Sequence, residues 1–72
     1  MLLGDIMIWN ERIKELREDS DLTQLQLAEI LGTTQRTVSY YENDQREIPV
    51  NVLVKYANYF NVSLDYICGL EK

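Results

Sequence analysis

The sequence has no histidine, one cysteine and one proline, and each shortage excludes a class of protein. With Cys68 as the only thiol and no imidazole, neither a zinc site nor an intramolecular disulfide can be assembled. One proline and three glycines leave little material for long loops or low-complexity linkers. The single cysteine fits a reduced, cytoplasmic setting in which Cys68 is a small core residue.

Long apolar runs are also missing. The apolar start, residues 1–9, is interrupted by Gly4 and Asp5, is too short to cross a bilayer, and lacks the basic lead of a secretion signal. We therefore expect no membrane association. The 72 residues allow one domain at most. This length is marginal for burying a core, so the packing must be efficient or a partner must contribute.

Positive charge is scarce. Seven basic side chains stand against twelve acidic ones, giving a formal net charge of −5, whereas nucleic-acid-binding proteins usually carry a basic surface. The acidic excess lies mostly before Thr23 and disappears after Pro49, and Arg36 is the only charged residue from Gly32 to Tyr41. The balance therefore predicts weak non-specific affinity for nucleic acid rather than no affinity.

Apolar residues recur with a helical period in five segments, and no segment alternates with period two, so we predict an all-α fold without a sheet. The first helix is expected from about residue 10 to 19, with Asn10 as its N-cap. The second begins at Thr23, which forms a capping box with Gln26, and ends at Gly32, where a left-handed backbone costs little.

The remaining segments carry equally local signals. The third helix starts at Thr33 or Thr34 and continues to about Asn43, followed by an irregular stretch at 43–48. Pro49 suits the first turn of a fourth helix, which runs to about Asn61 with these residues on its buried side: Val50, Leu53, Val54, Ala57 and Phe60. The last helix is short, is capped by Ser63 and ended by Gly69, and has Leu64 and Ile67 directed inward.

The stretch 24–43 has the pattern of two helices that meet at a tight turn. Ala28 is small where the helices must cross, and Gly32 has no Cβ where the chain must turn. Apolar side chains are available to seal the inner faces, namely Leu27, Leu31, Val38 and Tyr41. These features at this spacing predict a helix-turn-helix.

The second of these helices has a polar outer side. If Val38 and Tyr41 face inward, a rotation of about 100° per residue directs Arg36, Ser39, Tyr40 and Asn43 outward, with Gln35 at the exposed first turn. Glutamine can bond adenine in a bidentate way and arginine can do so with guanine. The pattern therefore favours recognition of DNA bases, although a solvated helix surface would look the same.

Three runs carry a resemblance to a known family: RIKELRE at 12–18, LTQLQLAEILGTTQRTVSYYEN at 22–43, and REIPVNVLVKYANYFNVSLDYICG at 46–69. They resemble the Cro/CI-type helix-turn-helix family (the XRE family) of phage repressors and bacterial regulators. The resemblance implies a compact five-helix, lambda-repressor-like domain at 10–70 behind an N-terminal extension at 1–9. It also implies a partner, double-stranded operator DNA, read in the major groove by a two-fold dimer.

The resemblance also assigns roles to single residues. It implies DNA contacts from Gln24, Thr34, Gln35, Arg36, Thr37, Ser39, Tyr40, Asn43 and Arg46. Gln35, at the start of the recognition helix, is expected to read bases, and Gln24 to contact a phosphate and brace Gln35. Asn43 matches a phosphate contact. Arg17 and Glu42 match a largely buried ion pair that ties the first helix to the third.

Several residues depart from the family pattern. Tyr40 stands where a basic residue is frequent, and Asp44 stands where glycine is common, although aspartate tolerates the left-handed conformation. Leu25 and Ile30 are apolar where the family is often polar. They are interpreted as surface apolar residues, as a partner contact, or as a sign that the predicted helix register is inaccurate.

These observations predict a sequence-specific DNA-binding regulator that needs no cofactor or metal. We expect this regulator to be a repressor. No phosphate loop, nucleophile elbow or metal cluster supports an enzyme, and no small-molecule effector domain is visible. The alternative is a protein-interaction module, an antitoxin-like partner that keeps the fold. A homodimer is expected, formed by the C-terminal helices, in which Tyr56, Tyr59 and Tyr66 are each a core or an interface residue, or by residues 1–8.

Overall fold

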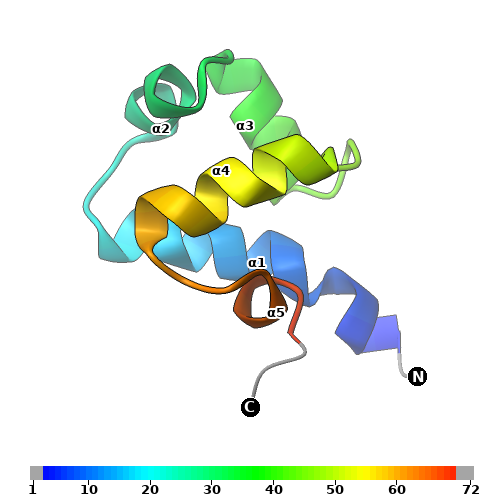
Figure 1. Cartoon of the computed structure of the whole chain (residues 1–72). Helices are drawn as coiled ribbons and strands as arrows, with labels where there is room; N and C mark the ends of the chain where they lie inside the picture. The colour runs from blue at the N-terminus through cyan, green and yellow to red at the C-terminus, as the bar shows by residue number, and fades with distance from the viewer. Residues whose placement is uncertain (1–2, 70–72) are drawn as a thin grey trace.

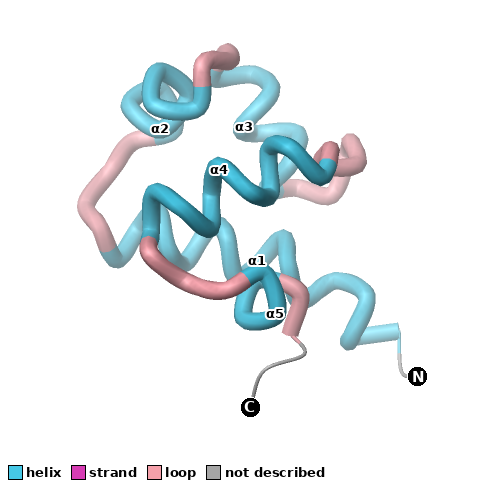
Figure 2. The backbone as a smooth tube through the Cα atoms, viewed as in Figure 1, coloured by secondary structure: helices cyan, strands magenta, loops and turns pink. Residues whose placement is uncertain are grey.

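The computed structural model describes residues 3–69 and consists of short helices joined by turns (Figure 1). Its helices are α1 (Leu3–Asp19), α2 (Gln24–Leu31), α3 (Gln35–Glu42), α4 (Val50–Phe60) and α5 (Leu64–Ile67). No strand occurs between residues 3 and 69 (Figure 2), so the predicted all-α, five-helix fold is confirmed.

The start of α1 differs from the prediction. The helix begins at Leu3, so Asn10 is not its N-cap but a buried residue in its middle, and the expected division between 1–9 and 10–70 lies inside the helix. Asn10 Nδ2 donates to the carbonyl oxygen of Tyr41 at 2.6 Å. Asparagine suits an N-cap because its side chain satisfies backbone groups nearby. Here the backbone group that it satisfies belongs to α3, which only the tertiary fold brings close.

The ends of α2 and α3 are as predicted. Thr23 Oγ1 accepts from the backbone of Gln26 at 3.1 Å while Gln26 Oε1 accepts from the backbone of Thr23 at 2.8 Å, which completes the capping box. Gly32 ends α2 with φ +74°, and the Thr33 amide donates back to Ala28 at 2.9 Å. Thr34 caps α3 by accepting from the Thr37 amide at 3.2 Å. The turn between the helices is therefore fixed by short-range chemistry.

The buried side of α4 differs in part from the prediction. Pro49 is the N-cap of the helix, one residue before the first turn in which it was predicted, and Asn61 ends the helix with φ +56°, as expected. However, Val50 is 72% exposed and Val54 is also exposed, whereas Tyr56 and Ala57 are buried. Apolar residues surround most of α4, so their spacing did not single out one inward side. The neighbouring helices α2 and α5 select it.

The last helix has one turn. Ser63 caps α5 by accepting from the Tyr66 amide at 3.0 Å, and Gly69 follows with φ +78°. Ile67 is fully buried, but Leu64, which was expected to point inward, is exposed. A helix this short can bury only the side chain that faces its neighbours, and here that residue is Ile67.

All of these helices contribute side chains to the core, which lies between the α2–α3 pair and the helices α1, α4 and α5. Its buried apolar residues are Ile13, Leu27, Ala28, Leu31, Val38, Tyr41, Tyr56, Ala57 and Ile67. The helix α3 packs against α2 and α1, while α5 packs against α4 and α1. Lys55 Nζ donates to the Leu31 carbonyl at 3.2 Å, which places a cation at the negative end of α2. None of the helices in residues 3–69 could cross a membrane.

Candidate nucleic-acid interface

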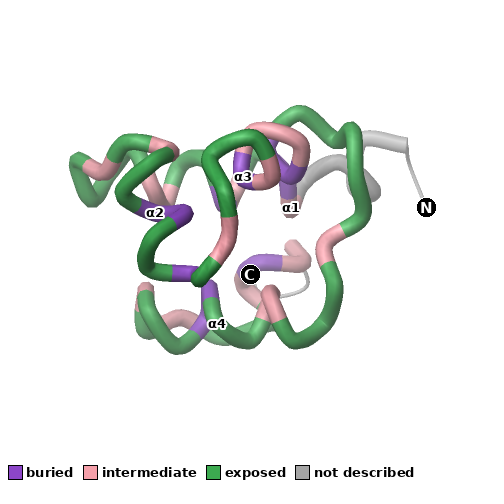
Figure 3. Tube along the Cα trace, turned by 90° about the horizontal axis from the view of Figure 1, so that it is seen from above, coloured by how far each residue is buried: buried purple, intermediate pink, exposed green. Residues whose placement is uncertain are grey.

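The outward side of α3, defined by Gln35, Arg36, Ser39, Tyr40 and Asn43, is open to solvent. Gln35, Arg36 and Asn43 are exposed, and Ser39 and Tyr40 are half-buried. The opposite side of the same helix is in the core, as the burial pattern in Figure 3 shows. The predicted division of α3 into a buried side and a polar, partly to fully exposed side is therefore present.

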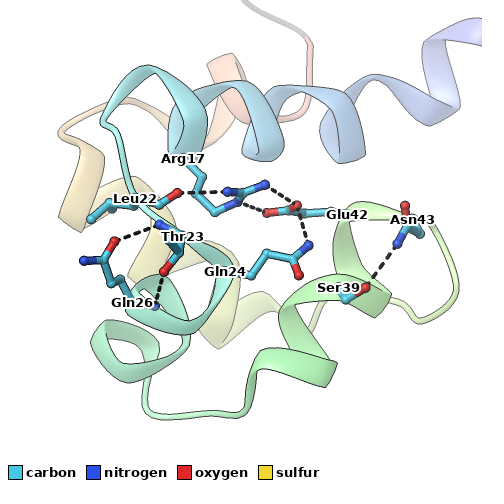
Figure 4. A network of polar contacts seen from close by, with 8 residues as sticks. All are labelled: Arg17, Leu22, Thr23, Gln24, Gln26, Ser39, Glu42 and Asn43. Carbon is cyan, nitrogen blue, oxygen red and sulfur yellow. Dashed lines mark hydrogen bonds and ion pairs between the residues drawn. The ribbon is translucent and has the colours of Figure 1, made fainter.

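Short hydrogen bonds order the two ends of this surface. At the start, the hydroxyl oxygens of Thr34 and Thr37 lie 2.9 Å apart. At the end, Asn43 Nδ2 donates to Ser39 Oγ at 3.2 Å (Figure 4). These bonds hold small polar groups in place and leave Gln35 and Arg36 exposed at the first turn of α3. The surface thus offers hydrogen-bond donors and acceptors of the kinds that contact phosphates and base edges.

A buried polar network fixes α3 relative to α1 and α2. Arg17 Nε donates to Glu42 Oε2 at 2.7 Å, and Arg17 Nη2 donates to Glu42 Oε1 at 3.0 Å (Figure 4). A third nitrogen, Nη1, donates to the Leu22 carbonyl at 2.8 Å. The two side chains are 11% and 1% exposed. The hydrogen bonds to Glu42 raise the pKa of Arg17 above its ordinary value. This is the ion pair that the family resemblance implied.

Gln24 belongs to the same network. This first residue of α2 is half-buried, and its Nε2 donates to Glu42 Oε1 at 3.1 Å. The resemblance implied that Gln24 braces Gln35, but here its amide nitrogen is engaged by Glu42. Gln24 therefore stands at the edge of the interface, with its position set by the same carboxylate that Arg17 holds.

Arg46 joins the outward side of α3 from the following loop. The helix α3 ends at Glu42, Asp44 in the following turn has φ +57°, and the Gln45 amide donates back to the Tyr40 carbonyl at 2.8 Å. The chain thus folds back along the helix, and Arg46 Cζ lies 5.1 Å from the centroid of the Tyr40 ring. Both residues were predicted from the sequence to contact DNA, but their contact with each other was not predicted. The one signal was that Tyr40 occupies a position where a basic residue is frequent.

The charges around this surface are mixed. Arg36 and Arg46 are its exposed cations, and the carboxylate of Glu42 is buried against Arg17. Asp44 and Glu47 add exposed negative charge in the loop after α3. The surface is therefore polar rather than strongly basic, which limits non-specific attraction to phosphates. Residues 3–69 contain no cluster of side chains suited to hold a metal ion.

Comparison with known proteins agrees with this geometry. Residues 13–67 match the helix-turn-helix family. Over 66 residues the chain is 36% identical to the HTH-type transcriptional regulator ImmR of Bacillus subtilis (strain 168), covering 92% of this chain and 52% of ImmR. Over 60 residues it is 38% identical to YobD, an uncharacterized HTH-type transcriptional regulator of the same organism, covering 83% and 54%.

A further relative has a different description. The chain is 37% identical over 62 residues to Antitoxin PezA of Streptococcus pneumoniae, covering 86% of this chain and 39% of PezA. The chain thus spans about half the length of the first two relatives and less of the third. The matched family is one of DNA-binding regulator domains and not of enzymes. The sequence match, the all-helical fold and the two-helix corner show that this chain belongs to the Cro/CI-type helix-turn-helix family, the XRE family.

Proposed function

We propose that this domain binds operator DNA in a sequence-specific manner and acts as a transcriptional regulator in the cytoplasm. The observation that carries the proposal is the two-sided character of α3: one side is part of the core and the other is polar and exposed. The major groove of B-DNA is about 12 Å wide and admits one α-helix. An α3 supported by α1 and α2 can enter the groove as a rigid unit.

The proposed contacts divide by chemistry. Gln35 and Arg36 are the base-reading residues, since both are exposed at the first turn of α3 and both side chains can make bidentate bonds to purines. The remaining polar residues are assigned to phosphates and sugars, which fix register without carrying sequence information: Gln24, Thr34, Thr37, Ser39, Asn43 and Arg46.

Selection of bound duplexes from a random pool tests the proposal directly. The expected result is a palindromic consensus. On that site, Gln35→Ala and Arg36→Ala should each weaken binding by about 1–3 kcal/mol and relax the base preference at one position. Ser20→Ala, at an exposed polar residue that follows α1 and lies outside α3, α4 and α5, is the control and should leave binding unchanged. If both α3 variants give the wild-type footprint and affinity, α3 is not the recognition helix.

We further propose that the domain binds as a homodimer through α4 and α5. One recognition helix spans few base pairs, and specific sites commonly consist of half-sites about 34 Å apart. The principal dimensions of the domain, 34 × 25 × 22 Å, allow two copies to sit side by side at that spacing. Apolar side chains are exposed on both helices, among them Val54, Tyr59 and Leu64. Sedimentation of wild-type protein as a monomer, both free and on a palindromic operator, would refute the dimer.

Repression is the proposed direction of regulation, because occupying an operator blocks transcription without any further surface. A reporter driven by the selected operator should be silenced by wild-type protein and restored by Gln35→Ala. Increased reporter activity in the presence of the wild type would instead identify an activator.

Binding to a protein partner is a second candidate function. Leu25 and Ile30 on α2 are 54% and 41% exposed, and one relative is described as an antitoxin. Such a role predicts that a defined protein partner is retained by the wild type and lost by Leu25→Lys, with no retention of duplex DNA at low salt. Retention of DNA by both forms favours the regulator.

A further inference from the structure

Tyr40 and Arg46 form a stacked pair that neither the sequence pattern nor the family resemblance assigned. The Arg46 guanidinium carbon lies 5.1 Å from the centroid of the Tyr40 ring, within the range of a cation–π contact. Tyr40 is half-buried and Arg46 is exposed. The ring therefore has a fixed place on α3, while the charged group above it faces solvent.

The backbone accounts for this arrangement. Asp44 adopts φ +57°, which reverses the chain after α3, and the Gln45 amide donates to the Tyr40 carbonyl at 2.8 Å. That bond holds the residue before Arg46 against the last turn of the helix. The pair thus depends on one left-handed residue and one hydrogen bond, and not on a long flexible loop.

The pair lies on the outward side of α3, which is the side proposed to contact DNA. On a helix, residues four apart lie on the same side, with Cβ atoms about 6 Å apart, so Tyr40 and Arg36 share the outward side of α3. Asp44 and Glu47 lie two positions before and one position after Arg46, and both are exposed acids. Without the ring, the guanidinium of Arg46 would be free to turn toward these carboxylates. The contact with the ring instead holds the Arg46 cation against the side of α3 that also carries Arg36.

We propose that Tyr40 is a positioning residue that orients Arg46 to contact a DNA backbone phosphate, so that the stacked pair replaces a basic residue on α3. This inference rests on the proposed function. A guanidinium stacked on a ring still directs its N–H donors outward in its plane, which suits a phosphate oxygen. Because the protein is acidic overall, each correctly placed cation contributes a large share of the attraction to DNA.

The stacking itself can be measured on the protein without DNA. In NMR spectra, ring currents should displace the Arg46 side-chain resonances in the wild type. The displacement should persist in Tyr40→Phe, which keeps the aromatic ring, and disappear in Tyr40→Leu. Unshifted Arg46 resonances in a folded wild type would overturn the proposal before any DNA is added.

The contact to phosphate is tested with a double-mutant cycle on the selected operator and on a scrambled duplex, each over a range of salt concentrations. Arg46→Ala should lower the slope of log affinity against log salt by about 1, equally on both duplexes. Tyr40→Leu should weaken binding about two- to fivefold, the range of an exposed cation–π contact. Tyr40→Phe should bind like the wild type, and Tyr40→Leu should have no further effect once Arg46 is alanine.

Arg12 provides the matched control. It stacks on Tyr66 in the same way, 4.3 Å from the ring centroid, but joins α1 to α5. Arg12→Ala should therefore leave the salt slope unchanged. If the effects of Tyr40→Leu and Arg46→Ala are additive while the protein still selects its operator, Tyr40 does not position Arg46, although the proposed function stands. If the wild type binds no duplex at all, the proposed function fails and the phosphate contact fails with it.

Discussion

The ion pair between Arg17 and Glu42 offers the sharpest test of how α3 is held in place. We predict that Arg17→Met, which keeps the length of the side chain but removes its charge, strongly destabilises the domain. In the wild type, Glu42 accepts two hydrogen bonds from Arg17 and one from Gln24, and its carboxylate is almost completely buried. The substitution leaves that carboxylate in the core with one partner.

The expected cost follows from that environment. Breaking a buried pair by removing one partner costs about 3–5 kcal/mol, because the remaining charge has lost its water and is no longer compensated. The free energy of unfolding of a domain this small is only about 5 kcal/mol. Arg17→Met should therefore be partly unfolded at 25 °C. Glu42→Leu should cost less, about 2–3 kcal/mol, because the longer arginine can extend its charged end to solvent.

Urea unfolding followed by circular dichroism measures these values. The decisive variant is the double substitution Arg17→Met with Glu42→Leu, which leaves no buried charge and should recover most of the loss caused by Arg17→Met. Arg12→Met is the control for removing a cation from α1, and it should cost no more than about 1 kcal/mol. If the double variant is as unstable as the sum of the two single ones, desolvation of a stranded charge is not the cause.

Two further predictions concern Tyr56 and Gly32. Burial raises the pKa of Tyr56, whose hydroxyl has no hydrogen-bond partner among residues 3–69, so Tyr56→Phe should be neutral or stabilising at pH 7. Because the folded state holds the Tyr56 proton more tightly than the unfolded state, the stability that depends on this proton is complete below the unfolded pKa of about 10 and is lost as the pH rises above it. In urea titrations between pH 10 and 12, the free energy of unfolding of the wild type should therefore fall by up to about 1.4 kcal/mol per pH unit relative to that of Tyr56→Phe. Parallel stability curves would contradict the burial argument. Gly32→Ala should cost about 1–2 kcal/mol from its positive φ alone, since a Cβ there meets no atom within 4 Å. A loss above about 3 kcal/mol in the same urea assay would reveal packing that the structure does not show.

The corner between α2 and α3 was predictable from the sequence because its determinants are local. The caps at these helix ends act on backbone groups within a few residues and need no partner from elsewhere in the chain; they are formed by Thr23 with Gln26, by Gly32 and by Thr34. The outward side of α3 followed from the same logic, because Val38 and Tyr41 left only one side of a short helix for the core. The residues on the outward side of α3 could therefore be predicted from the sequence, whereas the contact of Arg46 with Tyr40 could not.

Other features were decided by tertiary contacts. The side chain of Asn10 is equally able to cap a helix or to bond a distant carbonyl, and the approach of Tyr41 selects the second. The inward side of α4 was ambiguous because apolar residues surround it, and contact with α2 and α5 buries Tyr56 and leaves Val50 exposed. Helix ends and turns follow from chemistry within one segment, and so the sequence determines them. Burial depends on which surfaces meet, and only the folded chain decides that.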